Sequence, residues 1–183
     1  GKSLGYLIPV LLSNKRVLIS TYTKLLQDQI FYEDLSIALR VLASAKKVVV
    51  LKGRRNYLCP FKFGQLFDSP SMRFPADTLA EVSEIKTWST RTHTGDLSEL
   101  ETLSSSLTPM ITATAEECQK QRCPRFDQCP LYTAREKADR ADVVIVNHQL
   151  LMSRYENPSD DLVDLIDQMD VQLIDEADQF LRR

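Results

Sequence analysis

Two adjacent carboxylates follow an apolar run near the end of the sequence. The run at 171–174 stops at Asp175 and Glu176. Buried parallel strands deliver acids to the carboxyl edge of a sheet in this way. In phosphoryl transfer the first such acid holds Mg²⁺ and the second polarises the attacking water. A plain acidic helix start is the alternative, since acids suit a helix N-terminus.

The residues Gly1, Lys2 and Ser3 open the sequence and lead into an apolar run with helical spacing. Gly-Lys-Ser at a helix start is the end of a phosphate-binding loop, in which the lysine reaches the β- and γ-phosphates and the hydroxyl coordinates Mg²⁺. Such a tripeptide also arises by chance. Together with Asp175 it predicts a site for ATP and Mg²⁺, provided that both segments lie at one sheet edge. Because the loop is truncated, we expect the chain to be a fragment.

Four cysteines form a second candidate site. Cys118, Cys123 and Cys129 have the spacing C-x4-C-x5-C, and Cys59 is remote. With no signal peptide, metal or cluster ligation is a better interpretation than disulfides. Four thiolates suit either a tetrahedral zinc ion or a [4Fe–4S] cluster. Structural zinc prefers paired short spacings, so this pattern favours iron–sulfur.

Side chains suited to a nucleic-acid backbone follow two predicted strands. The first set lies at a strand-to-helix corner, and the second is the densest basic segment, with an aromatic ring beside it. These candidates are Thr21, Thr23 and Gln27, followed by Lys52, Arg54, Arg55 and Tyr57. Helix capping is the alternative for the first set, and a solvated loop for the second.

The elements that must position these residues alternate between strands and helices. Short apolar runs at 16–20, 47–51, 141–146 and 171–174 predict buried strands, separated by segments with helical periodicity. This order indicates an α/β fold with a parallel sheet. The rhythm breaks between 60 and 110, where helices are predicted only at 77–88 and 96–103. We therefore predict three segments, 1–56, 57–130 and 131–183, of which the middle one is an insertion.

Composition is ordinary for a soluble globular protein. The sequence has 183 residues, of which 43% are hydrophobic and 26% charged, and its formal net charge is −2. A nucleic-acid contact would therefore depend on local patches rather than on overall charge. No apolar stretch reaches the length of a membrane span, so we expect a cytoplasmic protein with no membrane contact.

Taken in order, these motifs resemble the DinG/XPD-like iron–sulfur DNA helicases of superfamily two, and most of all the bacterial DinG-like branch. The similar segments are 1–3, 20–27, 52–59, the cysteine run, 144–151 and 173–178. One departure is Asp178, where the family usually has His. That position concerns the coupling of hydrolysis to domain motion rather than the nucleotide site.

The resemblance implies a RecA-like (P-loop NTPase) motor domain, with a parallel sheet covered by helices on both faces and interrupted by a mostly helical and loop-containing iron–sulfur insertion. It implies an ATP-dependent DNA helicase that couples ATP hydrolysis to 5′→3′ movement on single-stranded DNA and to unwinding at duplex junctions, in repair or replication. The catalytic residues would be Lys2, Asp175 and Glu176. Gly1, Lys2, Ser3 and Asp175 would bind ATP and Mg²⁺, the four cysteines would hold [4Fe–4S], and the seven polar and aromatic candidates would contact DNA.

We expect a monomer. We also expect the chain alone to be inactive, because the arginine that a second motor domain supplies to the γ-phosphate is missing. The alternative is a non-enzymatic nucleic-acid-binding module stabilised by zinc or a cluster. Another phosphate-loop ATPase, such as a transporter motor, fits the cysteines poorly. Nucleotide binding that depends on Lys2 and Asp175 distinguishes the enzyme from the module.

Overall fold

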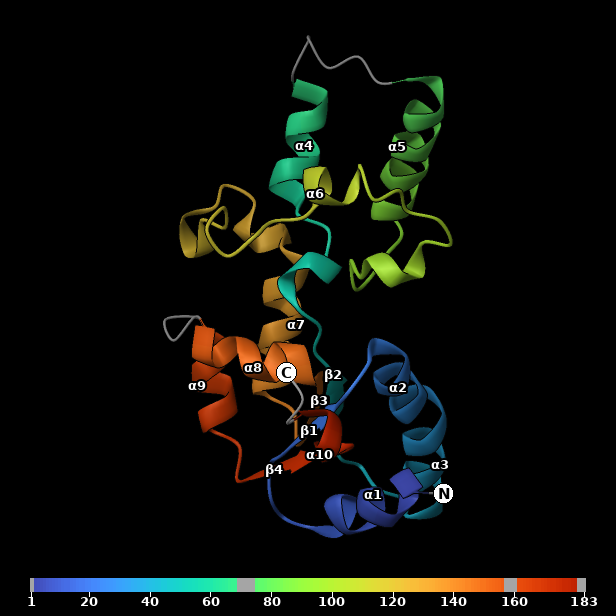
Figure 1. Cartoon of the computed structure of the whole chain (residues 1–183), viewed down its shortest axis with the longest axis vertical. Coiled ribbons are helices and arrows are strands. Elements are labelled where there is room, and N and C mark those ends of the chain that lie inside the picture. Colours follow the sequence, from blue (N-terminus) through green and yellow to red (C-terminus); the bar gives the residue numbers. More distant parts are fainter. Residues whose placement is uncertain (1, 69–74, 157–160, 181–183) are drawn as a thin grey trace. The chain divides into compact units, whose positions relative to one another are not determined.

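The computed structural model describes residues 2–68, 75–156 and 161–180. It divides the chain into two compact units (Figure 1). Residues 1–52 and 135–183 form the first unit, called here the sheet unit, and residues 53–134 form the second, called the cysteine unit. Within the described parts of the chain, every helix is too short or too polar to cross a membrane.

The sheet unit is built on four parallel strands in the order β2-β3-β1-β4. Their bounds are β1 Val17–Thr21, β2 Val48–Val50, β3 Val143–Asn147 and β4 Val171–Ile174. Thr21 pairs with Asn147, and the amide of Asp175 donates to the Ser20 carbonyl at 2.9 Å. The ends of β1, β3 and β4 therefore meet at one carboxyl edge of the sheet, where the predicted acids emerge.

Helices cover both faces of this sheet (Figure 1). The α1 helix (Lys2–Leu12), α2 (Lys24–Gln29) and α3 (Leu35–Val41) pack on the face formed by Val17, Ile19, Val143 and Ile145. A π-helical turn at Ile30–Asp34 joins α2 to α3. On the other side lie α8 (His148–Glu156) and α9 (Asp161–Asp167), and the short α10 (Ala177–Phe180) follows β4.

Burial explains the apolar runs read from the sequence. Every residue of β1 and of β3 is buried, as expected for central parallel strands covered on both faces. The edge strand β4 is more exposed; Val171 retains 43% of its accessible surface. The structure thus has the predicted all-parallel α/β architecture, which is consistent with a RecA-like fold.

Helices and turns make up the cysteine unit, and none of its described residues belongs to a named strand. The helices are α4 (Pro60–Asp68), α5 (Ala76–Ser89), α6 (Thr108–Ile111) and the beginning of α7 (Pro130–Asp139). Short 3₁₀ turns lie at Arg54–Asn56, Leu97–Glu99, Lys120–Arg122 and Phe126–Gln128. Its core joins α4, α5 and α6 through buried side chains, which include Phe63, Leu66, Val82, Ile85 and Ile111.

Two local predictions differ from the structure in this unit. The helix expected at 96–103 is only the turn Leu97–Glu99, because Leu100 is already extended. Helix α4 was not predicted, although Pro60 is favourable at its first turn and Phe63 and Leu66 share its buried face. That the unit is an iron–sulfur insertion bounded at 57 and 130 stays a prediction.

Candidate nucleotide site and cysteine pocket

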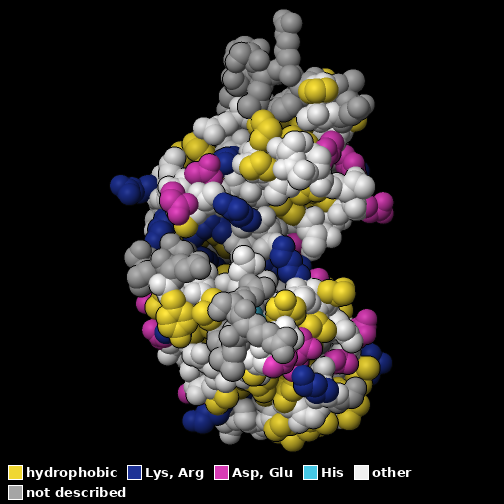
Figure 2. Space-filling view, in the orientation of Figure 1, with side chains coloured by type: hydrophobic (Ala, Val, Ile, Leu, Met, Phe, Trp, Pro, Cys, Tyr) yellow, Lys and Arg dark blue, Asp and Glu magenta, His cyan; other side chains and the backbone are white. Residues whose placement is uncertain are grey.

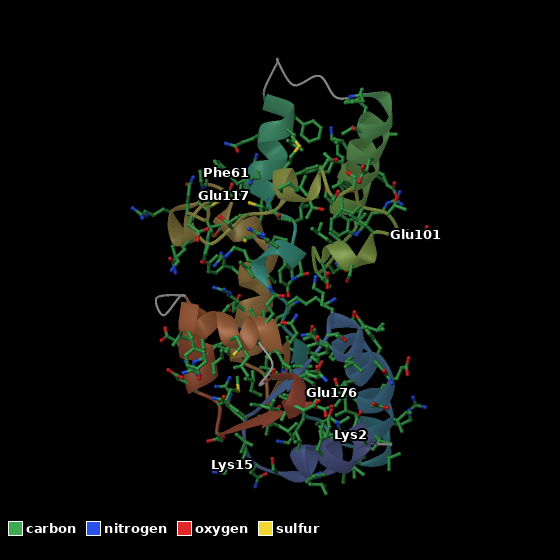
Figure 3. The ribbon with its side chains drawn as sticks, viewed as in Figure 1. Lys2, Lys15, Phe61, Glu101, Glu117 and Glu176 are labelled. Atoms are coloured by element: carbon green, nitrogen blue, oxygen red, sulfur yellow. The ribbon has the colours of Figure 1, made fainter. Side chains whose placement is uncertain are left out.

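The opening residues and the acidic pair meet at the carboxyl edge of the sheet. Nζ of Lys2, in the first turn of α1, lies 2.7 Å from Oδ1 of Asp175, which follows β4. Lys2 and Glu176 also lie close together in Figure 3, whereas Lys15 lies apart from them. Residues 173 positions apart thus share one site. Gly1, which we predicted to bind nucleotide, lies outside the described residues.

Both oxygens of the Asp175 carboxylate are engaged. Oδ1 faces Lys2 and accepts a hydrogen bond from the Glu176 amide at 2.9 Å, and Oδ2 accepts one from the Tyr6 hydroxyl at 3.0 Å. The acid is largely enclosed, with 12% of its side chain exposed, whereas 70% of the Lys2 side chain is exposed. The acid is therefore held in place, and the cation is free to reorient toward solvent.

The pKa shifts follow from these contacts. Partial burial alone would raise the pKa of Asp175, but hydrogen bonds from Lys2 and Tyr6 and the Lys2 charge hold it below its usual value. The Asp175 carboxylate in turn raises the pKa of Lys2. Burial, reinforced by Asp175, raises the pKa of Tyr6 well above its usual range, so its hydroxyl stays a donor. Near neutral pH the Asp175 carboxylate therefore faces one charged partner, Lys2, and one neutral hydrogen-bond donor, Tyr6.

Glu176, the predicted water-orienting base, has an unusual backbone. Its φ is +52°, a left-handed conformation that costs a non-glycine residue energy and is found most often at functional turns. Asp178, in the following short helix, is exposed, and its carboxylate accepts a hydrogen bond from Gln179. Ser3 is half-buried in the first turn of α1.

Asn147 and His148 lie at the same edge. Asn147 caps α8 by accepting from the Leu150 amide at 2.8 Å, so its polar side chain has a structural use. The fully buried His148 ring shares a 2.7 Å hydrogen bond between Nδ1 and the Ser20 hydroxyl. The Ser20–His148 contact joins β1 to the start of α8.

The predicted strand-tracking residues have mainly internal partners. Thr21 is fully buried and donates to the Thr23 carbonyl, and the Thr23 hydroxyl caps α2 by accepting from the Leu26 amide at 3.2 Å. The buried Gln27 side chain donates to the carbonyls of Leu51 and Ile145 at 3.0 and 2.9 Å. Because this arrangement uses both amide hydrogens of Gln27, the side chain has none left for a phosphate.

The basic segment is also less open than we predicted. Lys52 is 6% exposed and pairs with Asp28 at 3.2 Å, and the Tyr57 ring is 4% exposed, too buried to stack on a base. Arg54 is half-buried and Arg55 is exposed. The geometry therefore gives structural roles to Thr21, Gln27, Lys52 and Tyr57, and leaves Thr23, Arg54 and Arg55 as accessible candidates for nucleic acid.

The four cysteines, distant in sequence, line a single cavity of about 270 Å³ in the cysteine unit. All four are free thiols and half-buried. Among the described residues, no group of three or more His, Cys, Asp or Glu side chains could hold one metal ion. The four thiols therefore share one cavity.

Burial raises the pKa of Cys59 and of Cys129, and the neighbouring thiols add to the effect. Basic side chains lie beside these thiols: Lys62 and Arg125 line the same cavity. Lys62 also pairs with Glu117 at 2.9 Å and donates to the Pro109 carbonyl. The Lys120 backbone at the rim is left-handed, with φ +52°.

Three structural contributors were missed by sequence reasoning. Tyr6 lies one helical turn after Lys2, a spacing that places the two on one face of α1. Asp28 adjoins Gln27, and only the fold shows that it faces Lys52. Gly95 has φ +62°, and its carbonyl accepts from the Leu58 amide at 2.9 Å. Of these, Tyr6 alone had a usable signal, the i, i+4 spacing.

No family model matches the chain. It is 38% identical over 181 residues to ATP-dependent DNA helicase YoaA of Haemophilus influenzae, covering 98% of the chain and 28% of that protein. It is 34% identical over 158 residues to 3′-5′ exonuclease DinG of Bacillus subtilis, covering 84% and 17%. It is 33% identical over 172 residues to ATP-dependent DNA helicase DinG of Photobacterium profundum, covering 85% and 24%. The chain thus spans less than a third of the length of these relatives.

Proposed function

We propose that this chain, a homologue of one segment of the DinG-like helicases, forms the nucleotide-binding and cysteine-bearing part of an ATP-dependent DNA helicase. The observation that carries the proposal is the 2.7 Å approach of Lys2 to Asp175. A phosphate-loop lysine and a metal-binding acid can act on the same nucleotide only if it binds between them. The relatives' names differ between helicase and exonuclease, so the site residues rather than any one name decide the assignment.

At the nucleotide site each residue has a defined task. Lys2 moves from Asp175 to the β- and γ-phosphates, while Ser3 and Asp175 supply the hard oxygen ligands that Mg²⁺ prefers. When bound, Mg²⁺ neutralises charge on the phosphates. Glu176 orients the attacking water. Without nucleotide, Lys2 neutralises the enclosed Asp175 carboxylate, which keeps the acid ionised and available.

The cysteine pocket fits a [4Fe–4S] cluster better than a zinc ion. Four thiols around one cavity match the donor set of the cluster, and the C-x4-C-x5-C spacing lacks the paired short spacings of structural zinc sites. Arg125 places positive charge beside the cavity, which favours bound thiolates, whereas the charge of Lys62 is matched by Glu117 in the same lining. Cys59, Cys118, Cys123 and Cys129 would hold the cluster, which would serve as a structural centre for this unit.

For DNA, we propose contacts through Thr23, Arg54 and Arg55. The visible face of the molecule carries interspersed basic and acidic side chains (Figure 2), in line with the formal charge of −2. Binding would therefore depend on a few phosphate contacts and weaken with salt in proportion to their number. By family resemblance, the whole protein would move 5′→3′ on single-stranded DNA as a cytoplasmic monomer and act in repair or replication.

Nucleotide binding tests the enzyme assignment. Binding of a fluorescent ATP analogue with Mg²⁺ to the whole protein should be lost in Lys2→Ala and Asp175→Asn. It should be retained in the matched controls Lys15→Ala and Asp164→Asn, whose side chains are exposed. Equal binding by all four variants would refute the nucleotide site.

Metal analysis tests the pocket. Protein purified without oxygen should contain about four iron and four sulfide per chain, with broad visible absorbance. Cys118→Ser should lower the iron content, while Ser153→Cys, which adds a thiol in the sheet unit, should not raise it. One zinc per chain with no sulfide would instead favour the non-enzymatic nucleic-acid-binding module.

A further inference from the structure

The Tyr6 hydroxyl has a partner 169 positions away in the sequence. It donates to Oδ2 of Asp175 at 3.0 Å, whereas Lys2 lies against Oδ1 at 2.7 Å. Tyr6 and Lys2 are one turn apart on α1. The two oxygens of one carboxylate are therefore divided between two side chains of the same helix.

The side chains of Tyr6 and Lys2 differ in how freely they can move. The Tyr6 ring is half-buried and packs against the core between α1 and the sheet, so its hydroxyl is fixed in place. The Lys2 side chain is 70% exposed and can leave without disturbing the core. The Ser3 side chain, the other Mg²⁺ ligand assigned above, lies near enough to Tyr6 to oppose the rise in its pKa.

We propose that Tyr6 is a positioning residue that retains Oδ2 of Asp175 and thereby presents Oδ1 to the metal when Lys2 turns to the phosphates. This inference rests on the proposed nucleotide site. Without the tyrosine, only the Glu176 amide at Oδ1 would restrain the carboxylate once Lys2 leaves, and the terminal torsion of aspartate is broad. The metal would then meet a mixture of orientations instead of one.

The variant Tyr6→Phe removes the hydroxyl and keeps the ring in the core. In the whole protein, the Mg²⁺ concentration for half-maximal binding of a fluorescent ATP analogue should rise roughly tenfold, about the value of one hydrogen bond to a charged group. Affinity at saturating Mg²⁺ should change less than twofold. Mn²⁺ binding followed by electron paramagnetic resonance, in the presence of the nucleotide, gives a readout independent of turnover. Tyr32→Phe is the matched control, because that side chain is 70% exposed.

A double-mutant cycle separates positioning from general damage. Because Asp175→Asn is expected to lose nucleotide binding, the cycle is read by urea unfolding. Tyr6→Phe should lower the free energy of unfolding less in an Asp175→Asn background than it does alone, since the shared partner is altered. An unchanged midpoint in Tyr6→Phe, or a loss of affinity equal at every Mg²⁺ concentration, would overturn the positioning role. Retention of binding by Lys2→Ala would instead overturn the nucleotide site itself, so the two failures are distinguishable.

Discussion

Replacing Gly95 by alanine should strongly destabilise the cysteine unit. An added Cβ would clash with Cβ and Cγ of Pro130, and the backbone φ of +62° disfavours any side chain. The left-handed conformation costs about 1–2 kcal/mol and overpacking about 1–3 kcal/mol, so the free energy of unfolding should fall by roughly 2–5 kcal/mol. Because the Pro130 ring is rigid, the strain cannot be relieved by a rotamer change.

Replacing Gly64 by alanine should have the opposite effect on the free energy of unfolding. Gly64 lies inside α4, and nothing is within 4 Å of an added Cβ. Alanine there should raise the free energy of unfolding by about 0.5–1 kcal/mol, since glycine is a poor helix former. Urea unfolding of the chain, followed by circular dichroism, measures both variants. A Gly95→Ala protein as stable as the unsubstituted chain, or a Gly64→Ala protein equally destabilised, would refute this reasoning.

The substitution Gly95→Ala should also disturb the cysteine pocket. Gly95 contacts Pro130, which follows Cys129, and binds the Leu58 amide, which precedes Cys59. Displacement of Gly95 should therefore move two of the four thiols. If the pocket holds a cluster, Gly95→Ala should retain less iron than Gly64→Ala under the same purification.

Further predictions concern the sheet unit. Thr23→Ala should lower the free energy of unfolding by about 1 kcal/mol in urea, because it removes the cap of α2; no change would assign the hydroxyl to ligand contact alone. Gln27→Met should cost about 1–3 kcal/mol in the same assay, since the Leu51 carbonyl loses the Gln27 donor and the Ile145 carbonyl keeps only the Leu51 amide; a loss of DNA affinity at unchanged stability would contradict the internal role. The depressed pKa of Asp175 stabilises the fold above the unfolded-state value near 3.8, a contribution lost as pH falls through the lower folded-state pKa. Asp175→Asn should therefore flatten stability against pH in acid, and an unaltered acid limb would contradict the pairing.

The length and the positions of the apolar runs in the sequence were enough to predict the sheet. The apolar runs at 16–20, 47–51, 141–146 and 171–174 are all strands within about two residues, since a strand buried on both faces is apolar throughout. The cysteine unit was harder to predict, because its short helices and turns have weak periodicity. The expected helix at 96–103 illustrates this: Asp96 caps a single turn by accepting from the Ser98 amide.

The sequence predicted which residue types lie at the strand ends, but not whether their side chains face a ligand or an internal partner. A hydroxyl or amide at a strand end suits a phosphate and an internal carbonyl equally well, and Gln27 proved to bind two carbonyls of neighbouring strands. Lys52 likewise reads as a solvent-facing cation until Asp28 is placed beside it. Burial of these groups is a tertiary property, set by which face of α2 meets the sheet.

The pairing at the sheet edge suggests why ATP and Mg²⁺ should be recognised together. The single positive charge of Lys2, whose ammonium lies 2.7 Å from the acid, cannot fully neutralise both Asp175 and an incoming phosphate. Nucleotide alone would take Lys2 and leave an enclosed carboxylate without its cation. Mg²⁺ alone would have to compete with Lys2 for Oδ1. When both bind, the nucleotide draws Lys2 away from Oδ1, and Mg²⁺ replaces the lost positive charge beside Asp175. Each ligand should therefore raise the affinity for the other by linkage.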